Sequence, residues 1–213
     1  MKTYQTYLFD FDYTLADSSR GIVICFRNVL DRHGFHQIDD HTIKRTIGKT
    51  LPESFSILTG ITDTDILEAF RKEYVKEADQ HMTVNTRLFP ETGKVLHSLK
   101  NNGATIGIIS TKYRYRILEL VGKVFPEGFF NIIVGGEDVK TPKPSPEGLN
   151  IAIERLQTDK ATTLYIGDST VDAETARNAG VDFAGVLHGM TTREELAVYP
   201  HVSIADTLEE LAE

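Results

Sequence analysis

The chain has 213 residues, of which 40% are hydrophobic and 25% charged, and its formal net charge is −8 at pH 7. This is the composition of a folded globular protein, and the acidic balance argues against a nucleic acid or an anionic membrane held by bulk charge. Cys25 is the single cysteine, which excludes an intrachain disulfide. Asp10 and Asp12 break the first apolar run, so we expect no signal peptide, no membrane span and a cytoplasmic protein.

The first predicted strand, residues 7–11, carries Asp10 and leads directly into Asp12. Side chains two apart lie on one face of a strand, and a bend at its end can aim both carboxylates into one cleft. Open α/β sheets bind ligands at the carboxyl ends of their parallel strands. Asp10 and Asp12 are therefore candidate site residues, although such pairs also begin turns and cap helices.

Residues 17–85 contain no predicted strand, and their apolar residues recur at helical spacing. Asp63 or Thr64 is placed to cap the longest of these helices. The alternative to a separate helical unit is one large mixed domain. Because the insertion begins just after the carboxylate pair, we predict an inserted all-helical cap over residues 17–85. The core domain then consists of residues 1–16 and 86–213.

The rest of the chain alternates short apolar runs with helical patterns. Further strands are predicted at residues 105–109, 131–134, 163–166, 183–186 and 201–204. Helices are predicted at residues 91–102, 115–123, 146–156, 172–179, 193–199 and 208–211. This alternation predicts an α/β fold with a Rossmann-like, doubly wound parallel sheet covered on both faces.

Two later strand ends carry candidate phosphate-binding groups. Ser110 and Thr111 follow the strand at 105–109, where a hydroxyl and backbone N–H groups can hold a phosphate oxygen. Such residues also often cap the next helix. Lys143 lies between two prolines, and Pro146 can start the following helix. This stiff setting favours a fixed ammonium that neutralises developing charge over an ordinary surface lysine.

A second pair of carboxylates follows the strand at 163–166. Asp168 stands at the strand end and Asp172 comes four residues later, about one helical turn, so both can face the same site. A plain helix cap is the alternative interpretation of either residue. Clustered carboxylates repel one another unless a cation lies among them, and oxygen ligands favour Mg²⁺. The cysteine and histidine pattern does not suggest zinc.

Taken in order, these residues resemble the four motifs of the haloacid dehalogenase superfamily in its phosphatase branch. The first motif reads Asp-Phe-Asp-Tyr-Thr at residues 10–14, with Tyr13 where the family commonly has glycine. Ser110, Lys143 and the Gly-Asp-Ser run at 167–169 supply the other three, and the match runs from Tyr7 to about Gly180. The spacing and tail are most similar to phosphoglycolate phosphatase and related pyrophosphatase members.

The resemblance implies a covalent mechanism. Asp10 would attack phosphorus and become an aspartyl phosphate, while Asp12 would protonate the leaving oxygen and later activate water. Ser110, Thr111 and Lys143 would hold the phosphoryl oxygens.

The resemblance also implies a Mg²⁺ site. Asp10, the backbone carbonyl of Asp12 and Asp168 would hold the ion, and Asp172 would support it from outside or through water. The substrate would be a small phosphate monoester of the phosphoglycolate kind, with inorganic pyrophosphate as the runner-up. Small sugar phosphates also stay open.

Three other functions are alternatives to this one. A dehalogenase of the same fold would not need Asp12 or Mg²⁺. A β-phosphoglucomutase-like phosphotransferase places a histidine twelve residues after the nucleophile, and this position is Ile22 here. A non-catalytic binding module on this fold is the weakest alternative, because every catalytic residue type is present.

Specificity in this branch comes from the cap, where Lys49, Arg45 and Arg20 are the candidate substrate contacts. The alternative for each is a solvated surface cation. The expected partner is a small phosphorylated metabolite, not a nucleic acid or a membrane. We expect a monomer or a weak homodimer.

Overall fold

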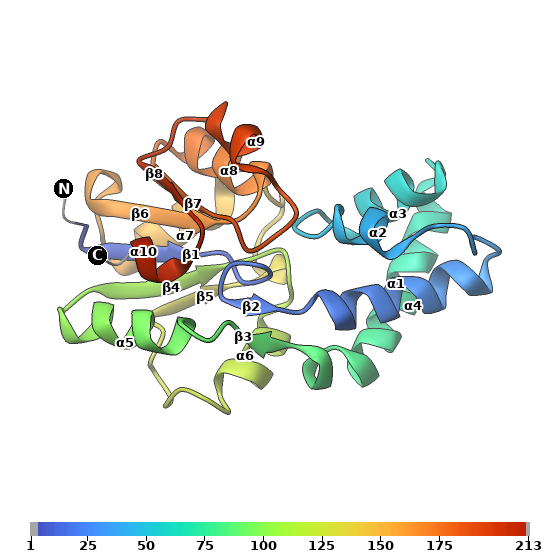
Figure 1. Cartoon of the computed structure of the whole chain (residues 1–213), viewed down its shortest axis with the longest axis horizontal. Coiled ribbons are helices and arrows are strands. Elements are labelled where there is room, and N and C mark those ends of the chain that lie inside the picture. The colour runs from blue at the N-terminus through green and yellow to red at the C-terminus, as the bar shows by residue number, and fades with distance from the viewer. Residues whose placement is uncertain (1–3, 212–213) are drawn as a thin grey trace. The chain divides into compact units, whose positions relative to one another are not determined.

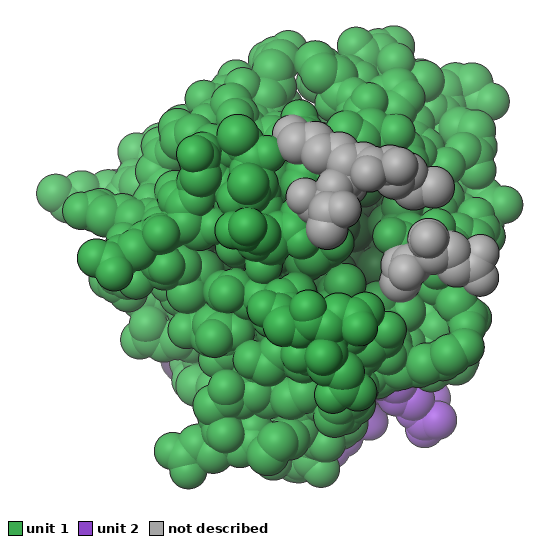
Figure 2. All heavy atoms as spheres, turned by 90° about the vertical axis from the view of Figure 1, so that its left-hand side faces the viewer, with its two compact units in different colours: residues 1–16, 88–213 green, residues 17–87 purple. Residues whose placement is uncertain are grey.

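The computed structural model describes residues 4–211 of the chain (Figure 1). It contains two compact units: one runs to Ala16 and resumes at Leu88, and the other is Asp17–Arg87. The first unit is one continuous body although the chain enters it twice (Figure 2, green). The second boundary falls after Arg87 and not at residue 85. The chain passes from one unit to the other at strands β2 (Ala16–Asp17) and β3 (Arg87–Leu88), which pair as a two-stranded sheet.

A six-stranded sheet in the order β5-β4-β1-β6-β7-β8 organises the first unit, and every neighbouring pair is parallel. Its strands are β1 (Thr6–Phe9), β4 (Thr105–Ile109), β5 (Ile132–Val134), β6 (Thr163–Gly167), β7 (Asp182–Val186) and β8 (Ser203–Ala205). From β1 the chain runs outward through β4 to β5 at one edge. It then returns to β6, beside β1, and runs outward through β7 to β8 at the other edge. The central strand β1 is therefore flanked by β4 and β6, which is the switch point where such sheets bind ligands.

Each face of the sheet packs against its own hydrophobic core. Phe9 of β1 belongs to the cluster with helices α5 (Thr92–Asn101), α6 (Arg114–Val121) and α10 (Leu208–Leu211). Its neighbour Leu8 belongs to the cluster with α7 (Glu147–Leu156), α8 (Thr170–Ala179) and α9 (Arg193–Ala197). Alternate residues of one strand thus serve opposite cores, as pleated geometry requires. The expected α/β fold with a parallel sheet covered on both faces is confirmed.

The ends of several elements differ from those predicted. Strand β1 ends at Phe9 and not at residue 11, because the chain turns so that the amides of Leu15 and Ala16 both donate to the carbonyl of Phe11. Helix α8 begins at Thr170, two residues before Asp172, because Ser169 and Asp172 form a reciprocal capping box. Three short 3₁₀ helices, η1 (Thr83–Asn85), η2 (Gly136–Asp138) and η3 (Lys160–Thr162), were not predicted.

The second unit contains helices α1 (Ser19–Arg32), α2 (Asp40–Lys44), α3 (Leu51–Thr59) and α4 (Thr64–His81), followed by η1. Asp63 caps α4 by accepting from the amides of Asp65 and Ile66. Its core combines aliphatic and aromatic side chains, and within it Phe55 packs against Phe26 and Phe70. Over residues 4–211, no helix has the length and apolar character that crossing a membrane requires.

Candidate active site

The predicted strand-end residues come together at the carboxyl edge of the sheet. Asp10 follows β1, and its amide donates to the carbonyl of Ile166 in β6 at 2.8 Å. Ser110 follows β4, and its amide donates to the carbonyl of Val134 in β5 at 3.0 Å. These bonds continue the strand pairing one residue beyond the strands. The sheet itself therefore fixes the backbone that carries the Asp10 and Ser110 side chains.

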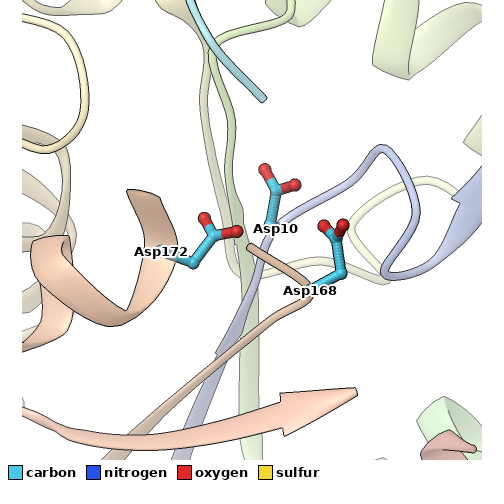
Figure 3. A group of neighbouring side chains, drawn as sticks. All are labelled: Asp10, Asp168 and Asp172. Atoms are coloured by element: carbon cyan, nitrogen blue, oxygen red, sulfur yellow. The ribbon is translucent and has the colours of Figure 1, made fainter. Parts of the chain in front are cut away.

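Three carboxylates meet at this edge. One oxygen from each of Asp10, Asp168 and Asp172 lies within 4.8 Å of the other two, and all three residues are buried. Figure 3 shows the three side chains grouped where β1 and β6 end and the first turn of α8 begins. Gly167 allows this close approach, because a Cβ there would lie 2.4 Å from the Cβ of Asp172.

Lys143 joins this group from the loop after β5. Its ammonium Nζ lies 2.8 Å from Oδ1 of Asp10 and 2.6 Å from Oδ1 of Asp172, and its side chain is only 5% exposed. Burial alone would lower the pKa of Lys143, but the charges of Asp10 and Asp172 outweigh it and hold that pKa well above its usual value. The lysine is therefore a buried cation in contact with two of the three carboxylates, and its role toward a phosphoryl group stays a prediction.

Two residues of this network were not predicted as site residues. The hydroxyl of Tyr165, in the middle of β6, contacts Oδ1 of Asp172 at 2.9 Å and accepts from Lys143 at 3.1 Å. The hydroxyl of Ser169 donates to Oδ2 of Asp172 at 2.5 Å. A tyrosine in the middle of a buried strand was the available signal, because a buried phenol normally has a hydrogen-bond partner.

The buried charges of the site do not balance among themselves. When Asp10, Asp168 and Asp172 are all ionised, Lys143 compensates one of three negative charges and two remain. Burial, opposed by Lys143 and reinforced by Asp172, raises the pKa of Asp10 to about 7. Burial and the charges of Asp172 and Asp10 raise the pKa of Asp168 well above its usual value.

These observations fit a hard divalent cation. All donors in the group are carboxylate oxygens, which are the ligands of Mg²⁺, and a charge of +2 matches the two uncompensated negative charges. Asp172 is the most enclosed of the three, at 0% exposed, and both of its oxygens receive protein hydrogen bonds. Asp10 and Asp168 are therefore the carboxylates best placed to contact an ion directly.

Asp12 lies apart from this trio. Its Oδ1 is 3.1 Å from the ammonium of Lys112, which was not predicted to have a role. The turn after β1 separates the two aspartates: Asp10 reaches Lys143, whereas Asp12 reaches Lys112. The bend after β1 was expected to bring both carboxylates together. In the structure each carboxylate instead contacts a different lysine.

The same turn gives Tyr13 a backbone conformation that favours glycine. Tyr13 has a backbone φ of +59°, in the left-handed region that side chains disfavour. Its Cβ faces Gly189, in the loop after β7, where an added Cβ would be 3.2 Å from Tyr13 and 2.0 Å from Oδ2 of Asp168. Gly189 was not predicted, and it allows the loop to pass directly over the carboxylate group.

The two predicted hydroxyl residues of the loop after β4 differ in their surroundings. Ser110 is 6% exposed, and its Oγ accepts from the amide of Lys112 at 3.3 Å. Thr111 is half-buried, and its carbonyl approaches Gly136 so closely that a Cβ there would be 2.4 Å away. Neither caps α6, whose first residue follows Tyr113.

The three cations predicted to contact substrate belong to the second unit. Lys49 forms an exposed i,i+4 ion pair with Glu53 at 2.9 Å. Arg45 is the C-cap residue directly after α2, and Arg20 lies exposed in the first turn of α1. Their contact with substrate stays a prediction.

Comparison with known proteins shows the family of the chain. The family model for haloacid dehalogenase-like hydrolases matches residues 7–186, which include all of the strand-end residues described above. The chain belongs to this family. The hydrolase is 30% identical to pyrophosphatase PpaX of Bacillus velezensis over 195 residues, covering 90% of this chain and 87% of that one. It is also 30% identical to phosphoglycolate phosphatase of Rhodobacter capsulatus, covering 92% and 90%.

A solved structure resembles the hydrolase more closely. The crystal structure of a Bacteroides fragilis protein that carries the name haloacid dehalogenase-like hydrolase superposes with a TM-score of 0.97. The two sequences are 62% identical over 98% of this chain and 100% of that one. The fold and the family membership expected from the four motifs are thus confirmed.

Proposed function

We propose that this hydrolase is a Mg²⁺-dependent phosphatase that cleaves a small phosphate monoester through an aspartyl-phosphate intermediate. The observation that carries the proposal is the buried set of Asp10, Asp168, Asp172 and Lys143, with two negative charges left for a divalent ion. Asp10, the carbonyl of Asp12 and Asp168 would hold Mg²⁺, and Asp172 would orient Lys143. When bound, the ion supplies charge neutralisation for the phosphoryl oxygens.

The residues of the chain then divide the chemistry between them. An oxygen of Asp10 forms a bond to phosphorus while the bond to the leaving oxygen breaks, and Asp12 gives that oxygen a proton. In the second half, water attacks phosphorus, Asp12 takes its proton, and the bond to Asp10 breaks to restore the carboxylate. Ser110, Thr111 and Lys143 hold the phosphoryl oxygens in line throughout.

Phosphoglycolate is the substrate that we propose first, because a curated relative that covers most of the chain bears the name phosphoglycolate phosphatase. Inorganic pyrophosphate is the second candidate, because a relative of equal identity is named a pyrophosphatase. Phosphate release from both compounds, and from a panel of small sugar phosphates, measured side by side with Mg²⁺ present, decides between them.

The mechanism is tested by replacing the nucleophile. Asp10→Asn keeps the shape of the side chain but removes the attacking anion, so we expect turnover to fall by several orders of magnitude with the fold intact. Wild-type enzyme that is quenched with acid during turnover of a phosphate ester should carry one phosphoryl group on the peptide that contains Asp10. The variant treated in the same way should carry none. Asp206→Asn is the matched control, because that side chain is 70% exposed in an ion pair with Arg193.

Metal dependence is tested separately. Activity should vanish with EDTA, return with Mg²⁺ and be poorly supported by Ca²⁺, whose larger and looser coordination misplaces the in-line geometry. Full activity in EDTA, or an Asp10→Asn enzyme that works at the wild-type rate, would overturn the proposal in favour of a metal-free hydrolase or another nucleophile.

A further inference from the structure

Each aspartate of the first motif is held by a different lysine. Lys143 contacts Asp10 at 2.8 Å from the loop after β5, and Lys112 contacts Asp12 at 3.1 Å from the loop after β4. The proposed mechanism gives Lys143 a role at the phosphoryl group but gives Lys112 none. The second lysine therefore needs an explanation of its own.

The Lys112–Asp12 pair is not an ordinary surface ion pair. The side chains of Lys112 and Asp12 are only 7% and 11% exposed. The ammonium of Lys112 also lies 6.0 Å from the ring centroid of Phe11, the residue between the two aspartates. An ion pair shielded from water to this degree holds its two groups in one geometry far more firmly than an exposed pair does.

The backbone of Lys112 is fixed from both sides. Its amide donates to Oγ of Ser110 at 3.3 Å, and its carbonyl accepts from the amide of Gly136 at 3.1 Å. Two residues on, the amide of Arg114 donates to the carboxylate of Glu137 at 2.9 Å. The segment that contains Lys112 is thus anchored to the start of η2, so the ammonium is delivered to a set position.

We propose that Lys112 is a positioning residue that holds the Asp12 carboxyl in the orientation needed for proton transfer to the leaving oxygen. The inference rests on the proposed function, in which Asp12 performs that transfer. Because the ammonium holds Oδ1 of Asp12, it restricts rotation of the carboxyl group and so limits where the second oxygen lies. A lysine that instead bound an anionic part of the substrate would have a different kinetic signature.

The signature follows from the chemistry of the departing group. As the bond from Asp10 to phosphorus forms, the electron pair of the breaking bond goes to the leaving oxygen, which takes the proton of Asp12. A leaving group that is more acidic than an ordinary phenol, such as p-nitrophenol, departs readily as the anion and has little need of that proton. Phenol is less acidic and of nearly the same shape, so its departure depends much more on a well-placed donor.

The test compares two esters, phenyl phosphate and p-nitrophenyl phosphate. For each ester the measured quantity is kcat/KM, because kcat/KM reports only the first half of the reaction. A general acid contributes about 10²–10⁴-fold, and Lys112→Met should forfeit about 10- to 100-fold of it on phenyl phosphate. The loss on p-nitrophenyl phosphate should be at most about threefold, since little proton transfer is needed there. Asp12→Asn should show the same selectivity more strongly.

Further variants separate orientation from folding and from general charge effects. In the Asp12→Asn background, adding Lys112→Met should not increase the selectivity between the two esters, because the group it positions is already gone. Lys112→Arg should restore part of the phenyl phosphate activity. Lys112→Gln is the second neutral variant, should the methionine variant not fold, and Lys123→Met on the exposed surface is the matched control.

The outcomes distinguish this inference from the proposed function. Equal losses on both esters, or a rise in KM alone, would overturn the positioning role and make Lys112 a substrate-binding residue. If Asp12→Asn shows selectivity and Lys112→Met shows none, only the inference fails. If Asp12→Asn shows no selectivity, or Asp10→Asn retains activity, the proposed mechanism itself fails.

Discussion

Two ion-pair networks in this protein have similar bond lengths and opposite physical characters. In the second unit, Arg32 contacts Glu73 at 3.0 Å and Glu77 at 2.7 Å, and its side chain is 47% exposed. In the first unit, Lys143 contacts Asp10 and Asp172 at 2.8 and 2.6 Å, with side chains at most 5% exposed. Distance alone does not distinguish the two networks, whereas access to water does.

The carboxyl pKa values show the difference. Hydrogen bonds from Asn28 and Arg32 lower the pKa of Glu77, as expected where water already solvates the charge. Burial raises the pKa of Asp10 to about 7 even though a lysine touches it. In the surface network, water and the paired side chains stabilise each charge. In the buried network the carboxylates outnumber the ammonium, so negative charge remains that a bound cation would neutralise, as a metal-dependent site requires.

The largest effect is expected from breaking the buried network. Lys143→Met leaves Asp10 and Asp172 without their ammonium, and loss of one charged donor at the reacting centre typically lowers kcat by about 10²–10³-fold. Thermal melts should also show lower stability, since breaking a buried pair costs about 3–5 kcal/mol. Steady-state kinetics against the exposed control Lys123→Met measures the first effect. A rate near that of the wild type would remove Lys143 from the reaction.

Mg²⁺ should stabilise the protein more at pH 8 than at pH 6. The folded-state pKa of Asp10, about 7, exceeds its ordinary value of 3.8, so the folded state holds that proton more tightly. Proton binding by Asp10 therefore adds stability at low pH, and this stability is lost as the pH rises through about 7. At pH 6 the metal must displace that proton, which weakens the apparent metal affinity about tenfold and removes about 1.4 kcal/mol of metal stabilisation.

Differential scanning fluorimetry with and without Mg²⁺, at constant ionic strength, measures this dependence. Asp168→Asn serves as the control, because it removes one carboxylate of the trio and should reduce the metal-induced shift in Tm at both pH values. An equal Tm gain at pH 6 and pH 8 would show that the metal and the raised pKa of Asp10 are not linked.

A smaller effect is expected from Tyr165→Phe, which keeps the ring and removes the hydroxyl. Lys143 and Asp172 each lose one contact, worth about 1–3 kcal/mol for a bond to a charged group. We expect kcat to fall about tenfold with little change in KM, because the lysine is less firmly aimed. Tyr199→Phe, also in the first unit, is the control, and a matching loss in that variant would indicate a general effect of tyrosine removal.

The smallest effect is expected from the surface network. Arg32→Met should change the free energy of unfolding by less than about 1 kcal/mol, because exposed pairs exchange their bonds with water, and kcat should not change. Urea unfolding monitored by circular dichroism measures this. A loss above about 2 kcal/mol would mean that the Arg32 network stabilises the helical unit as strongly as a buried one.

Much of the site could be predicted because its residues are adjacent to strand ends. Asp10, Ser110 and Asp168 each follow a short apolar run, and parallel strands deliver their carboxyl ends to one edge. Tyr165 was missed because its side chain reaches the site from inside a strand, where periodicity indicates only burial. Lys112 was missed because an ion pair with Asp12, a hundred residues away in sequence, leaves no local signal.

The sequence by itself determined the alternation of strands and helices, the inserted helical segment and the acidic and basic residues of the candidate site. These are local properties, set by apolar periodicity, capping residues and turn-forming residues. Only the tertiary structure decided which lysine contacts which aspartate, where the first strand stops, and that Asp10 and Asp172 contact the same ammonium. Those outcomes depend on the burial and distance of groups far apart in the chain, because a charge acquires its pKa and its partner from the folded surroundings.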